Sequence, residues 1–326
     1  MGIFTLKARR CLAGFLISGA LLFSAGCTSL SPQTLALKEQ RPAGLPPHVE
    51  LEQVPFVPQE DNFCGPSALA MVLNAEGVNV SLDTLIQEVY LPGREGSLQV
   101  EMLAAVRRHG LVAYPLAPKF GDVLREVAAG TPVITLENYG FSWYPKWHYS
   151  VMIGYDLDQF EVVRRSGEKA RRVVPMGIFE KVWQPGGYWA MVAMPPGRVP
   201  VTATETGYAT AVVALEQAGQ TRNASIAYRA MLERWPDSLS AQMGNGNTAY
   251  ASHDLATAEA AFRRATVDHP DSAAAFNNLA QVLSDQGRFD AALDAAEHAV
   301  SLGGPLLPET RSTLDEIRSK AGKLPH

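Results

Sequence analysis

The chain has 326 residues, of which 47% are hydrophobic and 19% are charged, and its formal net charge is −5. This composition supplies enough apolar material for a folded core and excludes wholesale disorder, and the length allows two domains. The acidic balance argues against nucleic acid as the main partner, because phosphate binding requires a basic face. The three cysteines form no even disulfide framework.

The first 26 residues have the features of a cleavable secretion signal. Basic residues from Lys7 to Arg10 precede an apolar run that is too short for a comfortable membrane span. Small residues ahead of Cys27 resemble the cleavage box of bacterial lipoproteins, although Ser24 stands where that pattern usually has Leu. The resemblance implies that Cys27 becomes a lipid-modified N-terminus. An ordinary signal peptide followed by a chance cysteine is the alternative interpretation.

A lipid at Cys27 would anchor the mature chain to a membrane. No Asp follows Cys27 directly, which by resemblance to lipoprotein sorting in Gram-negative bacteria favours the outer membrane of the cell envelope, facing the periplasm. Loss of the three basic residues of the signal would change the formal charge from −5 to −8. Residues 27–50 contain four prolines and are predicted to form a tether.

Residues 51–196 predict a single α+β domain. The expected helices cover residues 66–75, 81–90, 97–109 and 122–129, with Ser81 and Ser97 as N-caps. The expected strands cover residues 132–136, 148–155, 159–165 and 188–194, with a short helix at 176–183. Helices followed by strands are typical of an α+β fold rather than an alternating parallel sheet.

Beyond Gly197 the composition becomes rich in alanine, and the pattern repeats every 34 residues, as Ala224, Ala258 and Ala292 illustrate. Units at 204–237, 238–271 and 272–305 resemble tetratricopeptide repeats, whose paired helices stack into an all-α solenoid. Residues 306–326 supply a capping helix and a tail. The repeats imply a protein partner, and a generic alanine-rich bundle is the alternative. Gly244 and Gly246 lie inside a predicted helix and are expected to loosen it.

Cys64 is the only cysteine outside the signal and the lipid-attachment position. It stands at the predicted start of a helix, where N–H groups favour a thiolate. The amide of Gln59 and the backbone N–H of Cys64 are expected to stabilise an oxyanion. His148 opens a predicted strand, and we expect it to hold Cys64 as an ion pair and to act as base and acid. A lone cysteine is, by itself, more often a small buried hydrophobe.

The segment from Gln59 to Leu69 contains Cys-Gly-Pro-Ser-Ala-Leu, and His148 begins His-Tyr-Ser-Val-Met-Ile-Gly-Tyr-Asp. Together, in this order and separation, these blocks resemble the papain-like cysteine peptidases of the bacteriocin-processing type, which trim leader peptides after double-glycine sites. The resemblance covers roughly residues 52–195 and implies a papain-like fold, a thioester at Cys64 and a peptide or protein substrate. The sequence has no metal-ligand spacing and no phosphate-binding loop, so we expect neither metal nor cofactor.

The acid that this family usually places about sixteen residues after the histidine is missing, since residues 162–167 read Val-Val-Arg-Arg-Ser-Gly. Ser166, Asn138 and Asp156 are the candidates to orient the ring of His148. The arginine and lysine side chains between residues 164 and 172 are expected to form a solvated edge of a β-hairpin. A catalytically degenerate binding module that serves as an envelope scaffold, and an amidase or transglutaminase-like enzyme, are the alternatives to a peptidase.

Overall fold

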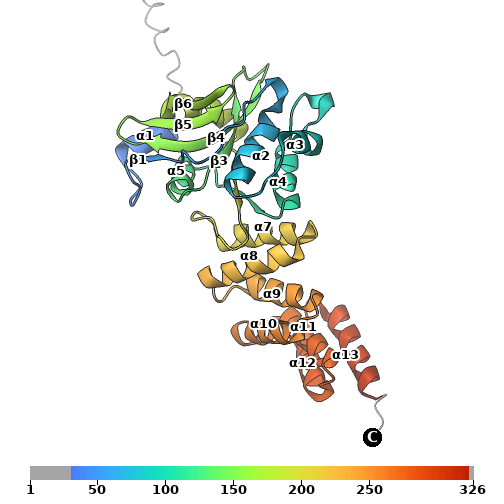
Figure 1. Ribbon diagram of the computed structural model, residues 1–326. Coiled ribbons are helices and arrows are strands. Elements are labelled where there is room, and N and C mark those ends of the chain that lie inside the picture. The colour runs from blue at the N-terminus through green and yellow to red at the C-terminus, as the bar shows by residue number, and fades with distance from the viewer. Residues whose placement is uncertain (1–30, 323–326) are drawn as a thin grey trace, which may run out of the picture.

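The computed structural model describes residues 31–322, so the predicted signal peptide and Cys27 lie outside the described residues. A sheet-containing N-terminal part is followed by a stack of antiparallel helices that extends away from it (Figure 1). This arrangement confirms the predicted α+β domain and the all-α array behind it. None of the helices formed by residues 31–322 combines the length and apolar character needed to cross a bilayer.

From residue 31 onward, the N-terminal part combines six α-helices with seven strands. The helices are α1 (Pro32–Glu39), α2 (Cys64–Ala75), α3 (Leu82–Val89), α4 (Gln99–Arg108), α5 (Phe120–Ala128) and α6 (Met176–Trp183). The strands are β1 (His48–Glu50), β2 (Val112–Pro115), β3 (Val133–Asn138), β4 (Trp147–Asp156), β5 (Glu161–Ser166), β6 (Lys169–Pro175) and β7 (Ala190–Met194). The sheet is antiparallel, with the order β2-β7-β3-β4-β5-β6 and with β1 paired to β4.

The predicted helices and strands of this part recur with small shifts at their ends, but strands β1, β2 and β6 were not predicted. Ser81 caps α3 as expected, because its side chain accepts a hydrogen bond from the N–H of Thr84. The cap predicted at Ser97 is wrong. Helix α4 begins after Leu98, and the buried Ser97 hydroxyl has no hydrogen-bond partner among the described residues.

The tether predicted at residues 27–50 is wrong for its described portion, which belongs to the folded domain. Helix α1 is held by Glu180 of α6, whose carboxylate accepts hydrogen bonds from the N–H of Thr34 at 2.7 Å and from its hydroxyl at 2.6 Å. The Ser31 hydroxyl donates to the carbonyl of Gly177 at 2.8 Å, and Leu37 is buried. These contacts cross about 146 positions of sequence, so the local proline content gave no sign of them.

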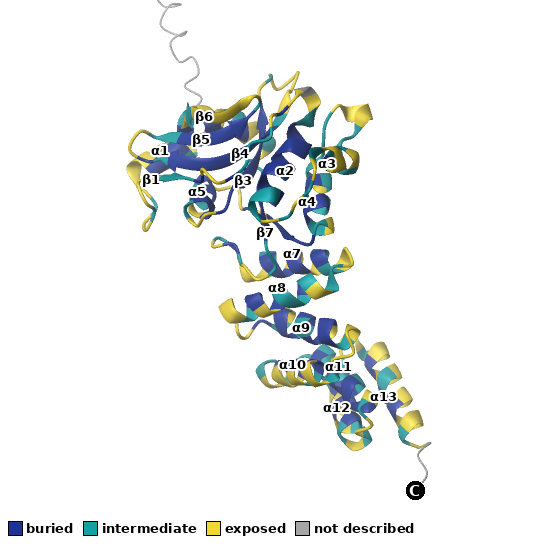
Figure 2. Cartoon of the chain, in the orientation of Figure 1, coloured by how far each residue is buried: buried dark blue, intermediate teal, exposed yellow. Residues whose placement is uncertain are grey.

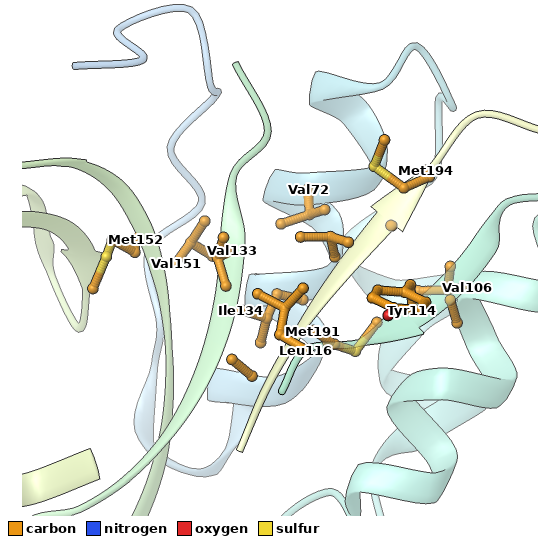
Figure 3. Close-up of a cluster of buried hydrophobic side chains, with 14 of the residues drawn as sticks. Val72, Val106, Tyr114, Leu116, Val133, Ile134, Val151, Met152, Met191 and Met194 are labelled. Atoms are coloured by element: carbon orange, nitrogen blue, oxygen red, sulfur yellow. The ribbon is translucent and has the colours of Figure 1, made fainter. Parts of the chain in front are cut away.

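Helix α2 is buried along nearly its whole length between the sheet and α3 and α4 (Figure 2). Val72 of α2, Ile134 of β3, Val151 of β4 and Met191 of β7 are fully buried in one hydrophobic cluster (Figure 3). Burial of each such side chain contributes about 1.5–3 kcal/mol relative to exposure. This packing fixes the position of the helix whose first residue is Cys64.

The helical array comprises seven helices. They are α7 (Glu205–Gln217), α8 (Thr221–Arg234), α9 (Leu239–Ala251), α10 (Leu255–Asp268), α11 (Ala273–Asp285), α12 (Phe289–Leu302) and α13 (Leu307–Ala321). The expectation that Gly244 and Gly246 loosen the second unit is wrong, because α9 is continuous across both. A Cβ at Gly244 would lie 2.3 Å from the ring of Tyr228, and one at Gly246 would lie 2.4 Å from Phe262. The two glycines therefore allow aromatic side chains of α8 and α10 to pack closely against α9.

The first repeat unit shares a hydrophobic core with the sheet domain. The Tyr114 and Tyr208 rings, from β2 and α7, lie with their centroids 6.4 Å apart. The hydroxyl of Tyr114 also accepts a hydrogen bond from the N–H of Thr204, and the buried Glu126 carboxylate accepts two from Thr202. The boundary predicted near residue 204 is therefore a junction inside a continuous core rather than a flexible linker.

Candidate active site

A cleft of about 820 Å³ lies where the start of α2, the segment before α4 and the start of β4 meet. The structure brings Cys64 and His148 to the same cleft. Arg94 and Lys146 supply positive charge along it, and Glu95 supplies negative charge. The full lining consists of Asn62, Cys64, Arg94, Glu95, Gly96, Ser97, Leu98, Tyr139, Tyr144, Pro145, Lys146, Trp147, His148 and Tyr149.

Cys64 is the first residue of α2, directly after the 3-10 turn Asp61–Phe63. Its side chain is buried, with 8% of the residue exposed, although it lines the cleft. Burial raises the pKa of the thiol, and the backbone N–H groups of Tyr149, Gly65 and Cys64 oppose that shift only in part. These amides show that β4, which carries His148, reaches the sulfur from the other side of the cleft.

His148 is the second residue of β4 and lies opposite Glu137 of β3 in the register. Its Nε2 atom is 3.0 Å from the hydroxyl oxygen of Ser166, which leaves Nδ1 to receive a proton from the cleft. Burial lowers the pKa of His148 to about 4, against an opposing effect of Glu137. Burial favours the neutral form of both groups and so opposes the expected thiolate–imidazolium ion pair in the free protein.

The expectation that Gln59 offers an amide to an oxyanion is not met in the free protein, where the side chain is turned to the backbone. Its Nε2 donates to the carbonyl oxygens of Tyr149 at 3.0 Å and Cys64 at 3.3 Å, and its Oε1 accepts from the N–H of Gly167 at 2.6 Å. Gln59 is buried and does not line the cleft. It therefore links the three segments that carry Cys64, His148 and Ser166.

Of the three candidates to orient His148, only Ser166 contacts the ring. The side chain of Asn138 instead accepts hydrogen bonds from the N–H groups of Gly140 and Lys146, both at 2.8 Å, and shapes the β3–β4 loop. Asp156 lies eight positions along β4 from His148, which corresponds to roughly 27 Å of extended strand. Its carboxylate caps a turn at the N–H groups of Asp158 and Gln159. The proposals for Asn138 and Asp156 are therefore wrong.

A buried carboxylate that the sequence analysis missed lies behind His148. Glu137 is fully buried and forms an ion pair with Arg164 of β5. Burial alone would raise the pKa of Glu137, but Arg164 and the hydroxyls of Ser150 and Tyr139 outweigh it and hold the pKa below its usual range. The group is therefore ionised at neutral pH. No sequence signal could reveal it, because a buried acid is recognised only through partners on other strands.

Tyr139 connects this carboxylate to the catalytic histidine candidate. Its ring stacks on His148 with a centroid separation of 5.0 Å, and its hydroxyl donates to Glu137 at 2.7 Å. The hydroxyls of Tyr139 and Ser166 lie 3.4 Å apart. Hydrogen bonds can thus point in one direction from His148 Nε2 through Ser166 and Tyr139 to Glu137. This chain ends on a negative charge and favours the tautomer that leaves Nδ1 free.

The solvated basic edge predicted for residues 164–172 is wrong at two positions. Arg164 is buried with Glu137, and Arg165 is buried with its guanidinium donating to the carbonyls of Ala170 and Glu52. Both arginines belong to β5, in which residues 162–166 are all buried, and this explains the difference. No group of three His, Cys, Asp or Glu side chains that could hold a metal occurs within residues 31–322.

Comparison with known proteins agrees with this geometry. Residues 51–191 match the model of the Peptidase_C39 like family, and residues 244–305 match a tetratricopeptide repeat model. The chain therefore contains a Peptidase_C39-like domain followed by tetratricopeptide repeats, as the resemblance predicted. A search of curated proteins gave no match.

Several solved structures are similar to parts of the chain. A C39-like peptidase from Bacillus anthracis shares 22% identity over 45% of this chain and 97% of that one, with a TM-score of 0.39. A double glycine motif protease from an AMS/PCAT transporter, in complex with the leader peptide, shares 22% identity over 43% and 90%, with a TM-score of 0.33. The Yersinia enterocolitica translocator chaperone SycD shares 17% identity over 35% and 83%, with a TM-score of 0.34.

Proposed function

We propose that this protein is a cysteine peptidase anchored by lipid in the envelope of a Gram-negative bacterium, with a repeat array that holds a protein partner. The observation that carries the catalytic part is the shared cleft of Cys64 and His148, with Nε2 of His148 engaged by Ser166. A neutral imidazole whose Nδ1 is not engaged by Ser166 is able to accept the thiol proton.

The reaction would be acyl transfer in two stages. The Cys64 sulfur attacks the substrate carbonyl carbon, and the thiol proton passes to Nδ1 of His148. Collapse of the tetrahedral intermediate breaks the C–N bond, with the same proton delivered to the leaving amine, and a thioester remains. Water, deprotonated by His148, then releases the carboxylic acid and restores the thiol.

Burial makes proton transfer from thiol to imidazole unfavourable in the free protein. The charge-separated pair therefore has to form together with the tetrahedral intermediate. The amides of Cys64, Gly65 and Tyr149 that already surround the sulfur are placed to stabilise negative charge at that stage. The chain from Ser166 to Glu137 would stabilise the imidazolium from its other side.

Localisation and partner are further parts of the proposal. The lipoprotein-like box at Cys27 supports a lipid anchor, and the absence of an Asp directly after it favours the outer membrane. The helical array of α7 to α13 supports a protein or peptide partner, since tetratricopeptide repeats form extended binding surfaces.

A second candidate is a binding module without catalysis. It is favoured by the burial of Cys64 and His148, which opposes a charge on either group, and by the engaged amide of Gln59. An amidase or transglutaminase-like transfer would use the same thioester and differ only in the acceptor.

One experiment separates enzyme from binding module. Labelling of Cys64 by a thiol-directed acyl probe at neutral pH is compared between the wild-type chain, Cys64→Ala and His148→Ala. We expect acylation faster than that of free cysteine, and loss of that advantage in His148→Ala. Acylation no faster than free cysteine, and unaffected by His148→Ala, would reject the peptidase. Mass spectrometry of the native N-terminus tests the lipid at Cys27, and an unmodified residue there would reject the anchor.

A further inference from the structure

The β3–β4 loop forms an aromatic hairpin, defined here as residues 139–147. Its backbone is fixed by reciprocal hydrogen bonds between Phe141 and Tyr144, at 3.0 and 3.1 Å, and by the side chain of Asn138. A Cβ at Gly140 would lie 2.3 Å from the carbonyl oxygen of Tyr144, so only glycine fits this turn. The hairpin is therefore a rigid projection.

The tip of the aromatic hairpin exposes large apolar rings. Phe141 is 66% exposed, Trp143 is 79% exposed and Tyr144 is 62% exposed. Phe141 and Trp143 stack on each other with a centroid separation of 5.5 Å and do not line the cleft. Within residues 31–322, every exposed Phe, Trp and Tyr lies in this hairpin. Isolated exposed apolar residues need no explanation, but a rigid cluster of aromatic rings indicates a contact surface.

A basic strand continues from the aromatic hairpin along the edge of the sheet. Strand β6 exposes Lys169, Arg171 and Arg172, and the guanidinium of Arg172 lies over the Tyr139 ring at 5.8 Å. Acids also lie near this strand: Glu168 is in the adjoining turn, Glu50 pairs with Arg171, and Glu52 and Glu161 also act on Arg171. Lys169 and Arg172 form no salt bridge with any described residue, so they carry the unpaired positive charge of this edge. The far end of β6 leads into Gly177, whose carbonyl accepts the hydrogen bond from Ser31.

This edge also contains the point at which the described chain begins. Helix α1, which directly follows Ser31, and the strands β3 and β4 that carry the aromatic hairpin lie at the same end of the molecule, the end opposite α13 (Figure 1). The seven residues of β6 that separate Ser31 from the aromatic hairpin span roughly 23 Å. Cys27 precedes Ser31 by four residues, so their Cα atoms lie at most about 14 Å apart whatever their conformation.

We propose that the aromatic hairpin and strand β6 form a membrane-docking edge that rests on the headgroup region of an anionic lipid bilayer. Trp and Tyr side chains favour the membrane–water interface, and basic side chains are attracted to anionic lipid. The inference takes its orientation from the proposed anchor at Cys27, since a lipid there would hold this edge against the bilayer. The opposite end, with α13, would point away from the membrane.

Docking at this edge places the catalytic cleft beside the lipid surface, because Tyr144 and Trp147 belong both to the aromatic hairpin and to the cleft lining. The peptides presented to Cys64 would then be those that lie at the membrane surface. The repeat array would reach for its partner at a distance from the bilayer.

Vesicle binding tests the edge without the anchor. The chain from residue 28, which contains every described residue and carries no lipid, is sedimented with vesicles of phosphatidylcholine with or without phosphatidylglycerol. We expect binding that needs the anionic lipid, and a loss of about tenfold in partitioning for Phe141→Ala/Trp143→Ala. Lys169→Gln/Arg171→Gln should reduce the preference for anionic vesicles. The matched control is Val267→Ala on α10 of the repeat array, where the valine is 74% exposed. This variant should bind vesicles as the wild type does.

The outcomes separate this inference from the proposed function, because acylation of Cys64 is measured on the same variants without vesicles. Phe141 and Trp143 lie outside the cleft, so Phe141→Ala/Trp143→Ala should keep the wild-type rate. Failure of the unanchored chain to bind anionic vesicles, or binding that survives Phe141→Ala/Trp143→Ala, would overturn the docking edge whatever the activity of Cys64. If Phe141→Ala/Trp143→Ala bound vesicles as the wild type does but lost peptide turnover, the two rings would be assigned to substrate binding instead.

Discussion

The Ser166→Ala substitution tests the positioning of His148 most directly. It removes the oxygen 3.0 Å from Nε2 and puts a methyl group in its place, inside a pocket where Ser166 is 2% exposed. A buried donor left without a partner costs about 1–3 kcal/mol. That free energy disfavours the orientation and tautomer in which Nδ1 serves as base. Reactivity of Cys64 should therefore fall by about 10–100-fold, because 1.4 kcal/mol corresponds to a factor of ten.

The assay is the second-order rate constant for alkylation of Cys64, measured across neutral pH. The matched control is Ser97→Ala, the same substitution on the α4 side of the same cleft. The Ser97 hydroxyl is buried and has no hydrogen-bond partner among the described residues, so its loss should leave the rate within a small factor of wild type. A rate for Ser166→Ala equal to that of Ser97→Ala would refute the positioning role.

Ser166→Asp should act in the opposite direction. A carboxylate next to Nε2 favours the imidazolium, and a charge-assisted hydrogen bond of about 1.5–3 kcal/mol corresponds to a rise of roughly 1–2 units in the pKa of His148. An NMR titration of the ring, starting from a pKa of about 4, measures this. A rise in Ser166→Asp together with a loss of reactivity in Ser166→Ala could not come from general disturbance of the pocket.

Three further predictions concern stability. Glu137→Gln and Arg164→Met should each lower the free energy of unfolding in denaturant by about 3–5 kcal/mol, since each leaves a buried charge unpaired. The double variant should lose clearly less. Equal losses for all three variants would contradict the pairing. Gly244→Ala should cost about 1–3 kcal/mol through overlap with Tyr228, whereas Gly93→Ala, with open space around it, should be close to neutral. The pKa of His148 is lower in the folded than in the unfolded chain, so the unfolded chain binds the proton first and the free energy of unfolding falls as the pH drops from 6.5 to about 4. The loss attributable to His148 is about 3 kcal/mol. It should be absent in His148→Gln.

The local features of the site could be predicted from the sequence because short segments specify them. The helix start at Cys64 follows from the apolar run behind it and from Pro66 in its first turn, and the strand at His148 follows from its β-branched and apolar residues. Ser166 was one of three candidates, and the sequence could not choose among them. The choice depends on which residue of β5 lies near the ring, and the pairing of β5 with β4, in which Arg165 lies opposite Val151, sets that.

The rest of the site depends on contacts between distant segments. Strand β6 is exposed along most of its length. Its sequence therefore lacks the alternation of apolar and polar residues that predicts a half-buried strand. Helix α1 is held by Glu180, and the charge of Glu137 is neutralised by Arg164 two strands away. Arg164, at the position of the missing acid, therefore belongs to the support of His148 through its ion pair with Glu137.

Gln59 can now be given a role that differs from that of an oxyanion donor. Its side chain joins Cys64, Tyr149 and Gly167, so Gln59→Ala should loosen all three segments of the site at once. Alkylation of Cys64 forms no oxyanion, whereas peptide turnover does, and the two assays therefore separate the roles. A positioning role predicts that Gln59→Ala slows alkylation and turnover together. Loss of an oxyanion donor would reduce turnover by about 10²–10³-fold and leave alkylation intact. The second result would mean that Gln59 releases the carbonyl of Tyr149 and turns to the cleft when substrate binds.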